Sequence, residues 1–366
     1  MKQKKKKKKK NPLLRHLTLT IAVGTILVTA ILFGTWQWLA NLLPSQKAAQ
    51  RWQGDSDMPF SQISCFLPAD QMIGLREVAT FRSAAAKKLE EASLDLNGEE
   101  NYMLDAWSTS GKVYTDGEHG RGEASVIAVG GDYFDFHPLK LLSGDYIRQS
   151  DLMKDRIILS EDVAWMLFGG TDLAGMTMKL NGIPFVVAGV VEQESDFASK
   201  RANSDTLDLY MSYDTLLQMD ENTKISCYEV ILPNPVKNFA LNVVRDKFPL
   251  GRGEYVCNTT RYDYGEMLGY IGKYGARGAG LSGAVLPYWE NAARRTENWA
   301  SLCCLLGTVL PVFPVVTGTF FAVKHGKKLK VRLEEDILPD VKEKTEEAIR
   351  VRQRKHWERV HGEHEK

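Results

Sequence analysis

The chain has 366 residues, with 47 basic and 46 acidic side chains, and 44% of its residues are hydrophobic. The nearly balanced charge hides an uneven distribution, because lysines are concentrated near the N-terminus, and the length outside the apolar runs can bury one sizeable core or two small ones. The composition suits a membrane protein whose bulk is an ordinary folded domain.

The N-terminal part combines a lysine run, Lys4–Lys10, with a long apolar run, 17–43. The apolar run is long enough to cross a hydrocarbon core of about 30 Å as a helix. Cleavage as a secretory signal is the alternative. We favour an uncleaved anchor, because the apolar part exceeds the usual length of about 7–15 residues and no small-x-small site follows it. The position of the lysines before a spanning helix indicates topology and contact with anionic membrane lipids, with no nucleic-acid partner.

The outer region, 44–298, begins with a predicted strand, 60–67, and a predicted amphipathic helix that starts near Asp70 and runs to Glu91. Asp70 is a suitable helix cap, and apolar residues recur at steps of three and four after it. Two short β-prone pieces, MLDAWST and SGKVYT, follow a polar break. This order of elements predicts a β-α-β type of unit.

The middle stretch, 126–211, alternates strand and helix signals. A strand ends at Gly-Gly, and a later strand leads into a helix with Ser160 as its N-cap and Gly169 as its stop. The pair Asn181-Gly182 joins two β-prone runs and is a strong hairpin signal. The stretch therefore predicts a β-rich unit that carries one short helix.

These blocks, in this order, resemble the periplasmic core domain of MacB-like and FtsX-like ABC transporter permeases. The segments that carry the resemblance are VIAVGGDYFDFHPLKLLSGDYI, DRIILSEDVAWMLFGG, DLAGMTMKLNGIPFVVAGVV and LYMSYDTL. We interpret the matching residues as turns, caps and core of the fold, with no catalytic, cofactor-binding or metal-binding role. They are Gly131, Tyr133, Phe134, Gly144, Ser160, Leu167, Phe168, Gly169, Gly182, Phe185 and Gly189.

The resemblance implies an α+β extracytoplasmic domain between two transmembrane helices, made of a porter-like α/β lobe and a β-rich lobe. It also implies a permease-type subunit that exports or extracts peptides, lipids or lipoproteins. The sequence has no G-x-x-x-x-G-K-[ST] phosphate loop, so we expect no enzyme activity in this chain and an ATPase subunit in trans. Further expected partners are a second permease subunit or a second copy of the chain.

The last part of the outer region is predicted to form a strand, a helix and a second strand, and the second strand contains a cysteine. The segment after it is rich in glycine. Among the outer cysteines we single out Cys227 and Cys257 as a candidate disulfide, because each lies in a strand-like stretch beside one helix; three free thiols are the alternative. The glycine-rich segment, 263–298, is predicted to be a flexible connector rather than a helix.

The second apolar run, 299–323, predicts another spanning helix, kinked by Pro311 and Pro314. Cations before the first span and after the second predict that both termini are cytoplasmic, in a cell membrane. Trp36, Trp38 and Trp299 then fall at the outer interface.

The charged tail, 324–366, is too polar to span and contains a predicted helix that starts near Pro339. We interpret the beginning of the tail as a candidate docking segment for a cytoplasmic partner; an exposed or disordered tail is the alternative. Related permeases have more spans, so we expect a permease subunit that other subunits complete. The competing function is a two-span scaffold or sensor, such as a polysaccharide chain-length regulator. The docking candidates are Lys324, Lys327, Lys328, Lys330 and Arg332.

The predicted organisation starts with a basic N-terminus (1–16) and the first span (17–43). The outer domain follows, with an α/β lobe made of 44–122 and 222–262, a β-rich lobe made of 123–221, and a glycine-rich connector (263–298). The second span (299–323) and the charged tail (324–366) complete the chain.

Overall fold

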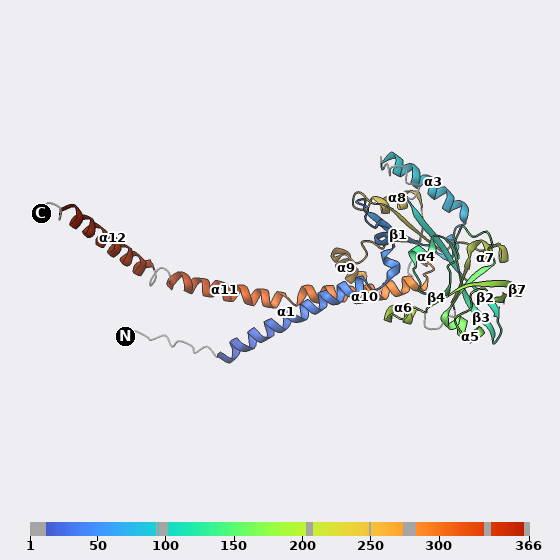
Figure 1. Cartoon of the computed structure of the whole chain (residues 1–366), viewed down its shortest axis with the longest axis horizontal. Coiled ribbons are helices and arrows are strands. Elements are labelled where there is room, and N and C mark those ends of the chain that lie inside the picture. Colours follow the sequence, from blue (N-terminus) through green and yellow to red (C-terminus); the bar gives the residue numbers. More distant parts are fainter. Residues whose placement is uncertain are drawn as a thin grey trace. The chain divides into compact units, whose positions relative to one another are not determined.

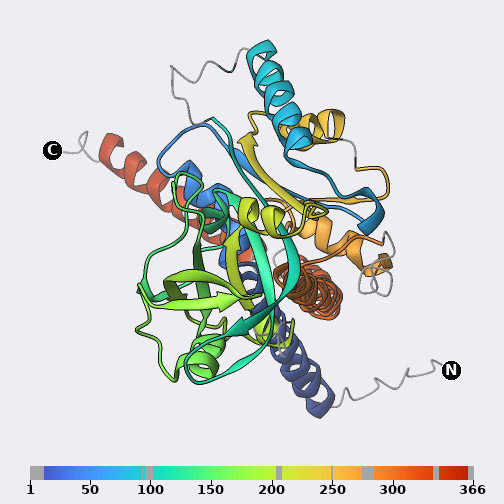
Figure 2. The same ribbon diagram turned by 90° about the vertical axis from the view of Figure 1, so that its right-hand side faces the viewer.

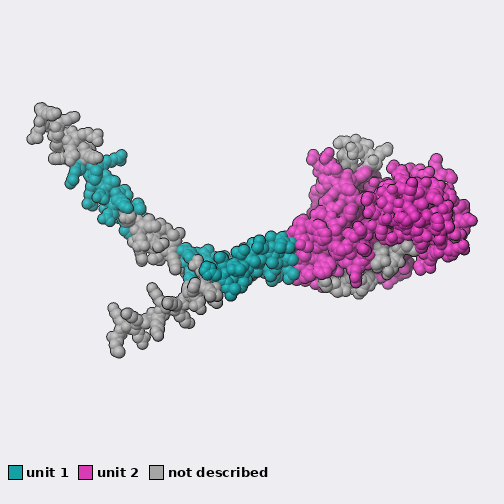
Figure 3. All heavy atoms as spheres, turned by 60° about the horizontal axis from the view of Figure 1, so that its bottom comes forward, with its two compact units in different colours: residues 1–32, 306–366 teal, residues 33–305 magenta. Residues whose placement is uncertain are grey.

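A computed structural model describes residues 12–92, 94, 102–202, 208–248, 250–273, 283–332 and 338–361. The chain divides into two compact units, which Figure 3 colours separately. Unit 1 comprises 1–32 and 306–366, and unit 2 comprises 33–305. Unit 2 contains the sheet and its covering helices, and each unit is described by itself.

Unit 1 consists of helical segments. It contains the first part of α1 (Pro12–Ala40), the end of α10 (Tyr288–Val309), α11 (Val312–Arg332) and α12 (Leu338–His361). Two stretches of helix are long and apolar enough to cross a membrane, His16–Ala40 and Tyr288–Gly326. The helix is interrupted at Leu310 and Pro311, where a proline cannot donate the hydrogen bond that a continuous helix needs. On α12, Glu346 and Arg350 form an ion pair at 3.7 Å.

Unit 2 (Figure 1) is built on one ten-stranded sheet. Nine strands follow the order β10-β1-β9-β2-β3-β8-β5-β7-β4, and β6 lies off this path and pairs with β2 and β7. The first lobe uses β1, β9 and β10 together with the start of the long strand β2. The second lobe uses the rest of β2 and the remaining strands. The bounds are β1 (Phe60–Phe66), β2 (Leu104–Asp116), β3 (Arg121–Gly131), β4 (Leu141–Gly144), β5 (Arg156–Ser160), β6 (Thr177–Leu180), β7 (Ile183–Val191), β8 (Asp208–Ser212), β9 (Cys227–Pro233) and β10 (Glu254–Cys257).

The strands of the second lobe pair in a closed ring, β2-β3-β8-β5-β7-β6 and back to β2. The ring closes where Thr115 and Asp116 of β2 pair with Leu180 and Lys179 of β6. Closure pairs backbone N–H and C=O groups that would otherwise be exposed at strand edges, as in a small barrel. Strand β2 therefore belongs to both lobes and connects them.

Helices cover both faces of the sheet. On one face, α3 (Leu75–Glu91) and α8 (Phe239–Lys247) pack side by side over the first lobe (Figure 2), and α5 (Glu161–Phe168) and α7 (Tyr213–Met219) extend the same core into the second. On the other face lie α2 (Ala48–Gln53), α4 (Tyr133–Phe136) and the first turn of α10. The short helices α6 (Phe197–Ala202) and α9 (Tyr264–Tyr270), and the 3-10 turns η1 (Pro44–Lys47), η2 (Ala69–Gln71) and η3 (Ile271–Lys273), complete the unit.

Several sequence predictions agree with the structure. The Asn181-Gly182 hairpin joins β6 to β7, and both residues have positive φ, as its tight turn requires. Helix α5 begins after Ser160 and ends at Gly169, which is left-handed. The Ser160 hydroxyl makes no capping hydrogen bond, however.

Other predictions were wrong in their boundaries. Helix α3 begins at Leu75 rather than at Asp70, because Glu77 accepts a hydrogen bond from the Gly74 N–H and closes a cap there, while Asp70 lies in η2. The two predicted pieces around Thr109 form the single strand β2.

The predicted flexible connector, 263–298, is also wrong at both ends, because α9 (Tyr264–Tyr270) and η3 (Ile271–Lys273) lie at its start and α10 occupies its last part. Helix α10 begins at Tyr288, eleven residues before the apolar run. The small side chains of Ala292, Ala293 and Thr296 lie on one face of this first part and are fully buried against the domain. Gly275, Gly278 and Gly280 lie outside the described residues.

The candidate disulfide between Cys227 and Cys257 is wrong. Strands β9 and β10 pair with opposite edges of β1, where Cys227 lies opposite Phe66 and Cys257 opposite Ile63. Two strand spacings separate them by about 10 Å before the register offset is added, beyond the roughly 7 Å that a disulfide allows between Cα atoms. All five cysteines are free thiols in the structure, and burial raises the pKa of the Cys65 thiol well above its usual range.

Candidate functional site at the ends of α1 and α10

The turn after α1 is fixed to the sheet by the side chain of Gln62 on β1, which is fully buried. Its amide accepts a hydrogen bond from the Ala48 N–H at 3.1 Å and donates one to the Ser45 carbonyl at 2.8 Å. Pro44 starts the 3-10 turn η1 that makes these backbone groups available. One side chain thus ties the segment that leaves α1 to the central sheet.

The beginning of α10 is fixed by a buried arginine, Arg261, in the turn between β10 and α9. Its guanidinium group, in a residue only 1% exposed, makes two parallel hydrogen bonds of 2.8 Å to the carboxylate of Glu290. Its Nε donates to Glu297 at 2.5 Å. Burial by itself lowers the pKa of Arg261, but Glu290 and Glu297 outweigh that effect and hold the pKa well above its usual value. Arg261 therefore stays charged and needs both carboxylates.

The same network reaches β10 and η1. Arg294 donates to Glu290 at 2.8 Å and pairs with Glu254 of β10. Arg261 also donates to the side chain of Gln46 in η1 at 3.0 Å. Residues 290, 294 and 297 are spaced by four and three, so they lie on one face of α10. We call Arg261, Glu290, Arg294, Glu297 and Glu254 the junction network.

A buried polar path continues from the junction network across the sheet. Asn258, which contacts Arg261 at 3.3 Å, donates to Ser64, and Ser64 donates to Glu229 at 2.6 Å. Glu229 also bonds the ring of His137 at 2.5 Å. The His137 ring lies 4.6 Å from that of Trp289, which belongs to α10. Polar and aromatic contacts therefore link α10 to both β1 and α4.

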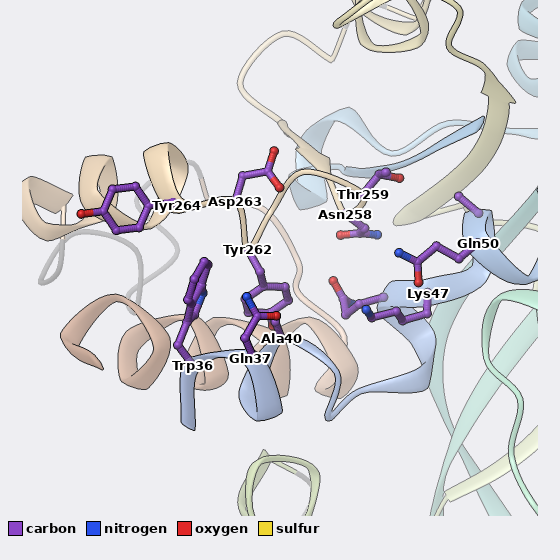
Figure 4. A pocket seen from close by; sticks show the side chains of 12 residues that line it. Trp36, Gln37, Ala40, Lys47, Gln50, Asn258, Thr259, Tyr262, Asp263 and Tyr264 are labelled. Carbon is purple, nitrogen blue, oxygen red and sulfur yellow. The ribbon is translucent and has the colours of Figure 1, made fainter. Parts of the chain in front are cut away.

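A cavity of about 270 Å³ lies beside the end of α1 (Figure 4). Trp36, Gln37 and Ala40 line it from α1, and the turn with Tyr262 and Asp263 lines it from the other side. The ring of Trp36 contacts that of Tyr264 edge-on at 6.1 Å. The side of the site that faces the end of α1 is thus hollow, and the junction network lies on the side that faces the start of α10.

The resemblance residues lie mostly away from this site, in the strands and helices of the second lobe. Gly144 and Gly189 face one another between β4 and β7, where a Cβ on Gly144 would lie 2.0 Å from the Ala188 carbonyl oxygen. Tyr133 is the exception, because its ring contacts Trp289 at 5.8 Å. Gly131 has positive φ, Phe134 stacks on Tyr146, and Leu167, Phe168 and Phe185 are buried. Their interpretation as scaffold stays a prediction.

The candidate docking segment lies on α11 in unit 1. The ammonium group of Lys324 lies 5.7 Å from the ring of Phe320. The side chains of Lys327, Lys328, Lys330 and Arg332 lie outside those that the structure describes. Docking there stays a prediction.

Sequence reasoning missed the junction network. Its available signal was the spacing of Glu290, Arg294 and Glu297 among small residues, in a segment that was interpreted as connector. Arg261 could not be found this way, because it is distant in sequence. Within the described residues, no group of three or more metal-ligating side chains comes together.

The fold and this junction define a class: a mixed α/β extracytoplasmic domain of a membrane-associated protein, with candidate spanning helices on both sides of it in the sequence. The chain belongs to the MacB-like periplasmic core domain family, whose sequence model matches residues 17–241. The prediction of a MacB-like permease domain from the sequence blocks is confirmed.

The sequences of curated relatives align with this chain over a short stretch only. The chain is 31% identical over 96 residues to the macrolide export ATP-binding/permease protein MacB of Neisseria gonorrhoeae, which is 26% of this chain and 14% of that protein. It is 32% identical over 84 residues to the uncharacterized ABC transporter permease YvrN of Bacillus subtilis, 21% of this chain and 20% of that one. The chain thus spans only a small part of the length of these relatives.

Solved structures with a similar fold include the periplasmic region of MacB from Actinobacillus actinomycetemcomitans. The match has 17% identity and a TM-score of 0.39, and it covers 54% of this chain and 89% of that structure. The extracellular domain of the transporter YknZ from Gram-positive bacteria matches with 14% identity and a TM-score of 0.37, covering 54% and 98%.

Proposed function

We propose that this chain is a permease-type membrane subunit of an ABC transporter complex, in which a partner ATPase on the cytoplasmic side drives movements of the extracytoplasmic domain. The observation that carries the proposal is the junction network. Five charged side chains hold the start of α10 against β10 and the β10–α9 turn. A displacement of α10 would therefore be passed to the sheet rather than absorbed by a loose linker.

The energetics favour such a role over simple anchoring. Buried ion pairs add little stability compared with apolar packing, but they fix geometry strongly, because a displaced partner leaves an uncompensated charge. A helix that only anchored a domain would need no such contacts. The substrate class, peptide, lipid or lipoprotein, stays a prediction from the sequence resemblance, as does the cytoplasmic orientation of both termini.

The deciding experiment is affinity purification of the full-length chain from native membranes, followed by mass spectrometry and an ATPase assay. We expect a phosphate-loop ATPase to co-purify and to hydrolyse ATP. Recovery of a homo-oligomer alone, with no nucleotide-linked activity, would overturn the proposal and favour the two-span chain-length regulator.

The docking segment is tested in the same purification. Replacing Lys327, Lys328, Lys330 and Arg332 with glutamine should reduce ATPase recovery severalfold, because a cationic segment loses its charge. The matched control replaces Lys342, Lys344, Arg350 and Arg352 on α12, and should leave recovery unchanged. Equal recovery in both variants would exclude docking through the α11 segment.

A further inference from the structure

Two neighbouring cavities, of about 490 and 440 Å³, lie between α6 and α10 in unit 2. Arg201 and Arg295 line both of them. Lys200 and Phe197 line the first, and Trp299 lines the second. We call Phe197, Lys200, Arg201, Arg295 and Trp299 the α6–α10 patch. It combines three cations with two exposed aromatic rings, and it is separate from the cavity beside α1.

The local fold of α6 presents this patch outward. The carboxylate of Asp196 accepts hydrogen bonds from the Ala198 and Ser199 N–H groups, at 2.9 and 3.0 Å, and so fixes the start of the helix. Ala198 is buried in a small cluster with Leu43, Ala292 and Ala293. With that face packed inward, Phe197, Lys200 and Arg201, spaced by three and four, share the exposed face.

The cations of the patch have no acidic partner among the described residues, since Lys200, Arg201 and Arg295 occur in no ion pair there. The neighbouring Arg294, by contrast, is paired with Glu290 and Glu254. Adjacent arginines on one helix thus have different roles. Arg294 is neutralised by the junction network although it also lines the second cavity, whereas Arg295 adds positive charge to both cavities.

The aromatic residues of the patch are of the kind that favours a membrane interface. Phe197 stacks on Trp38 near the end of α1, with ring centres 6.3 Å apart and planes inclined by 20°. Trp299 follows Arg295 by one helical turn, is 54% exposed, and begins the apolar part of α10. Indole rings at the ends of spanning helices favour the headgroup region. Cations at this depth face lipid phosphates.

We propose that the α6–α10 patch binds the phosphate-bearing headgroup of an anionic phospholipid in the leaflet that faces the domain. Guanidinium groups suit this ligand because their planar donors match phosphate oxygens. The aromatic side chains would contact the glycerol and upper acyl region. The site needs only membrane insertion and is independent of any ATPase partner.

The test uses the full-length chain in nanodiscs that contain phosphatidylglycerol and phosphatidylcholine, and native mass spectrometry of the lipids retained after release. The variant K200Q/R201Q/R295Q removes the three cations. We expect at least a tenfold loss of retained phosphatidylglycerol, since each surface cation contributes roughly fivefold to binding of an anionic lipid. Phosphatidylcholine retention should not change.

The control variant R76Q/K87Q/K237Q removes three exposed cations on and near α3 and α8, and should retain phosphatidylglycerol like the native protein. An unchanged thermal unfolding temperature in both variants shows that the fold persists. Equal retention of phosphatidylglycerol in the two variants would overturn the proposal. Displacement of the lipid by millimolar inorganic phosphate would overturn the lipid assignment and indicate a site for a free anion.

Discussion

Helices α1 and α10 meet the folded domain in different ways. The segment after α1 is held by the two hydrogen bonds of the neutral Gln62 side chain, and a cavity lies beside the end of the helix. The start of α10 is held by the buried, charged junction network around Arg261, and the cavities beside this helix lie on the side that faces α6. The two attachments therefore differ in chemistry, buried ion pairs at α10 and neutral hydrogen bonds after α1. We expect the ion-paired attachment to be the stiffer of the two, because a displaced partner leaves an uncompensated charge.

Such an asymmetry suits a domain to which a movement is transmitted through α10, while the attachment of α1 allows that helix to shift relative to α10. If both attachments were rigid, relative motion of the helices would strain the sheet. If both were loose, the motion would be lost before it reached β1. The following substitutions break or sharpen this comparison, from the largest expected effect to the smallest.

Replacing Arg261 with methionine should have the largest effect. The change leaves Glu290 and Glu297 buried without their main partner, and removing one partner of a buried pair costs about 3–5 kcal/mol. We expect a clear drop in the thermal unfolding temperature of the full-length protein, as measured by tryptophan fluorescence. Hydrogen exchange should accelerate in residues 288–298 of α10.

A matched control separates this local effect from general destabilisation. Leu167 on α5 is fully buried in the second lobe, and its replacement by alanine costs a similar 2–5 kcal/mol. This variant should unfold earlier without faster exchange at the start of α10. If both variants loosened α10 equally, the junction network would have no special role there.

Replacing Gln62 with leucine tests the α1 side. The substitution keeps the volume but leaves the Ala48 N–H and the Ser45 carbonyl without their partner, at a cost of about 1–3 kcal/mol. We expect faster hydrogen exchange in 44–53, and no change in 288–298. Equal loosening of both segments would mean that the two attachments form one unit, contrary to the comparison.

The sequence predicted the second lobe better than the junction. Its signals are local: Asn181-Gly182 specifies a hairpin, and Gly169 ends a helix within a few residues of the strand before it. The junction is assembled from Arg261, Gln46 and α10, which are far apart in sequence. No local sequence pattern therefore predicts it. The prediction has two β-prone pieces where the structure has the single long strand β2, because continuous pairing with β3 carries the strand through Thr109 and Ser110.

The early start of α10 was missed for a related reason. Tyr288–Asn298 carries charges that usually mark an exposed segment, yet Glu290 and Arg294 are buried because they are paired. Burial of charge depends on a partner that the segment itself does not contain. Tertiary contacts therefore decided both the helix boundary and the site.

The smallest expected effect concerns Glu194, which lies beside the first turn of α10. Burial raises the pKa of this carboxyl, and the hydrogen bond from Tyr288 and the nearby His137 only partly oppose that effect. Its Oε2 has no hydrogen-bond partner among the described residues. Because the folded protein holds the proton more tightly than the unfolded chain, stability falls as pH rises from the usual carboxyl pKa, about 4.3, through the raised value.

Glu194→Gln removes this penalty, so the variant should be more stable than the native protein at neutral pH, by about 1 kcal/mol or less. The difference should shrink as the pH is lowered through and below the usual carboxyl pKa, about 4.3, because Glu194 then becomes protonated in both states. Thermal unfolding across this pH range measures it. A pH-independent difference would mean that packing rather than ionisation is responsible. A destabilised variant would mean that the Glu194 carboxylate supports the first turn of α10, which would add a second charged attachment and strengthen the contrast with α1.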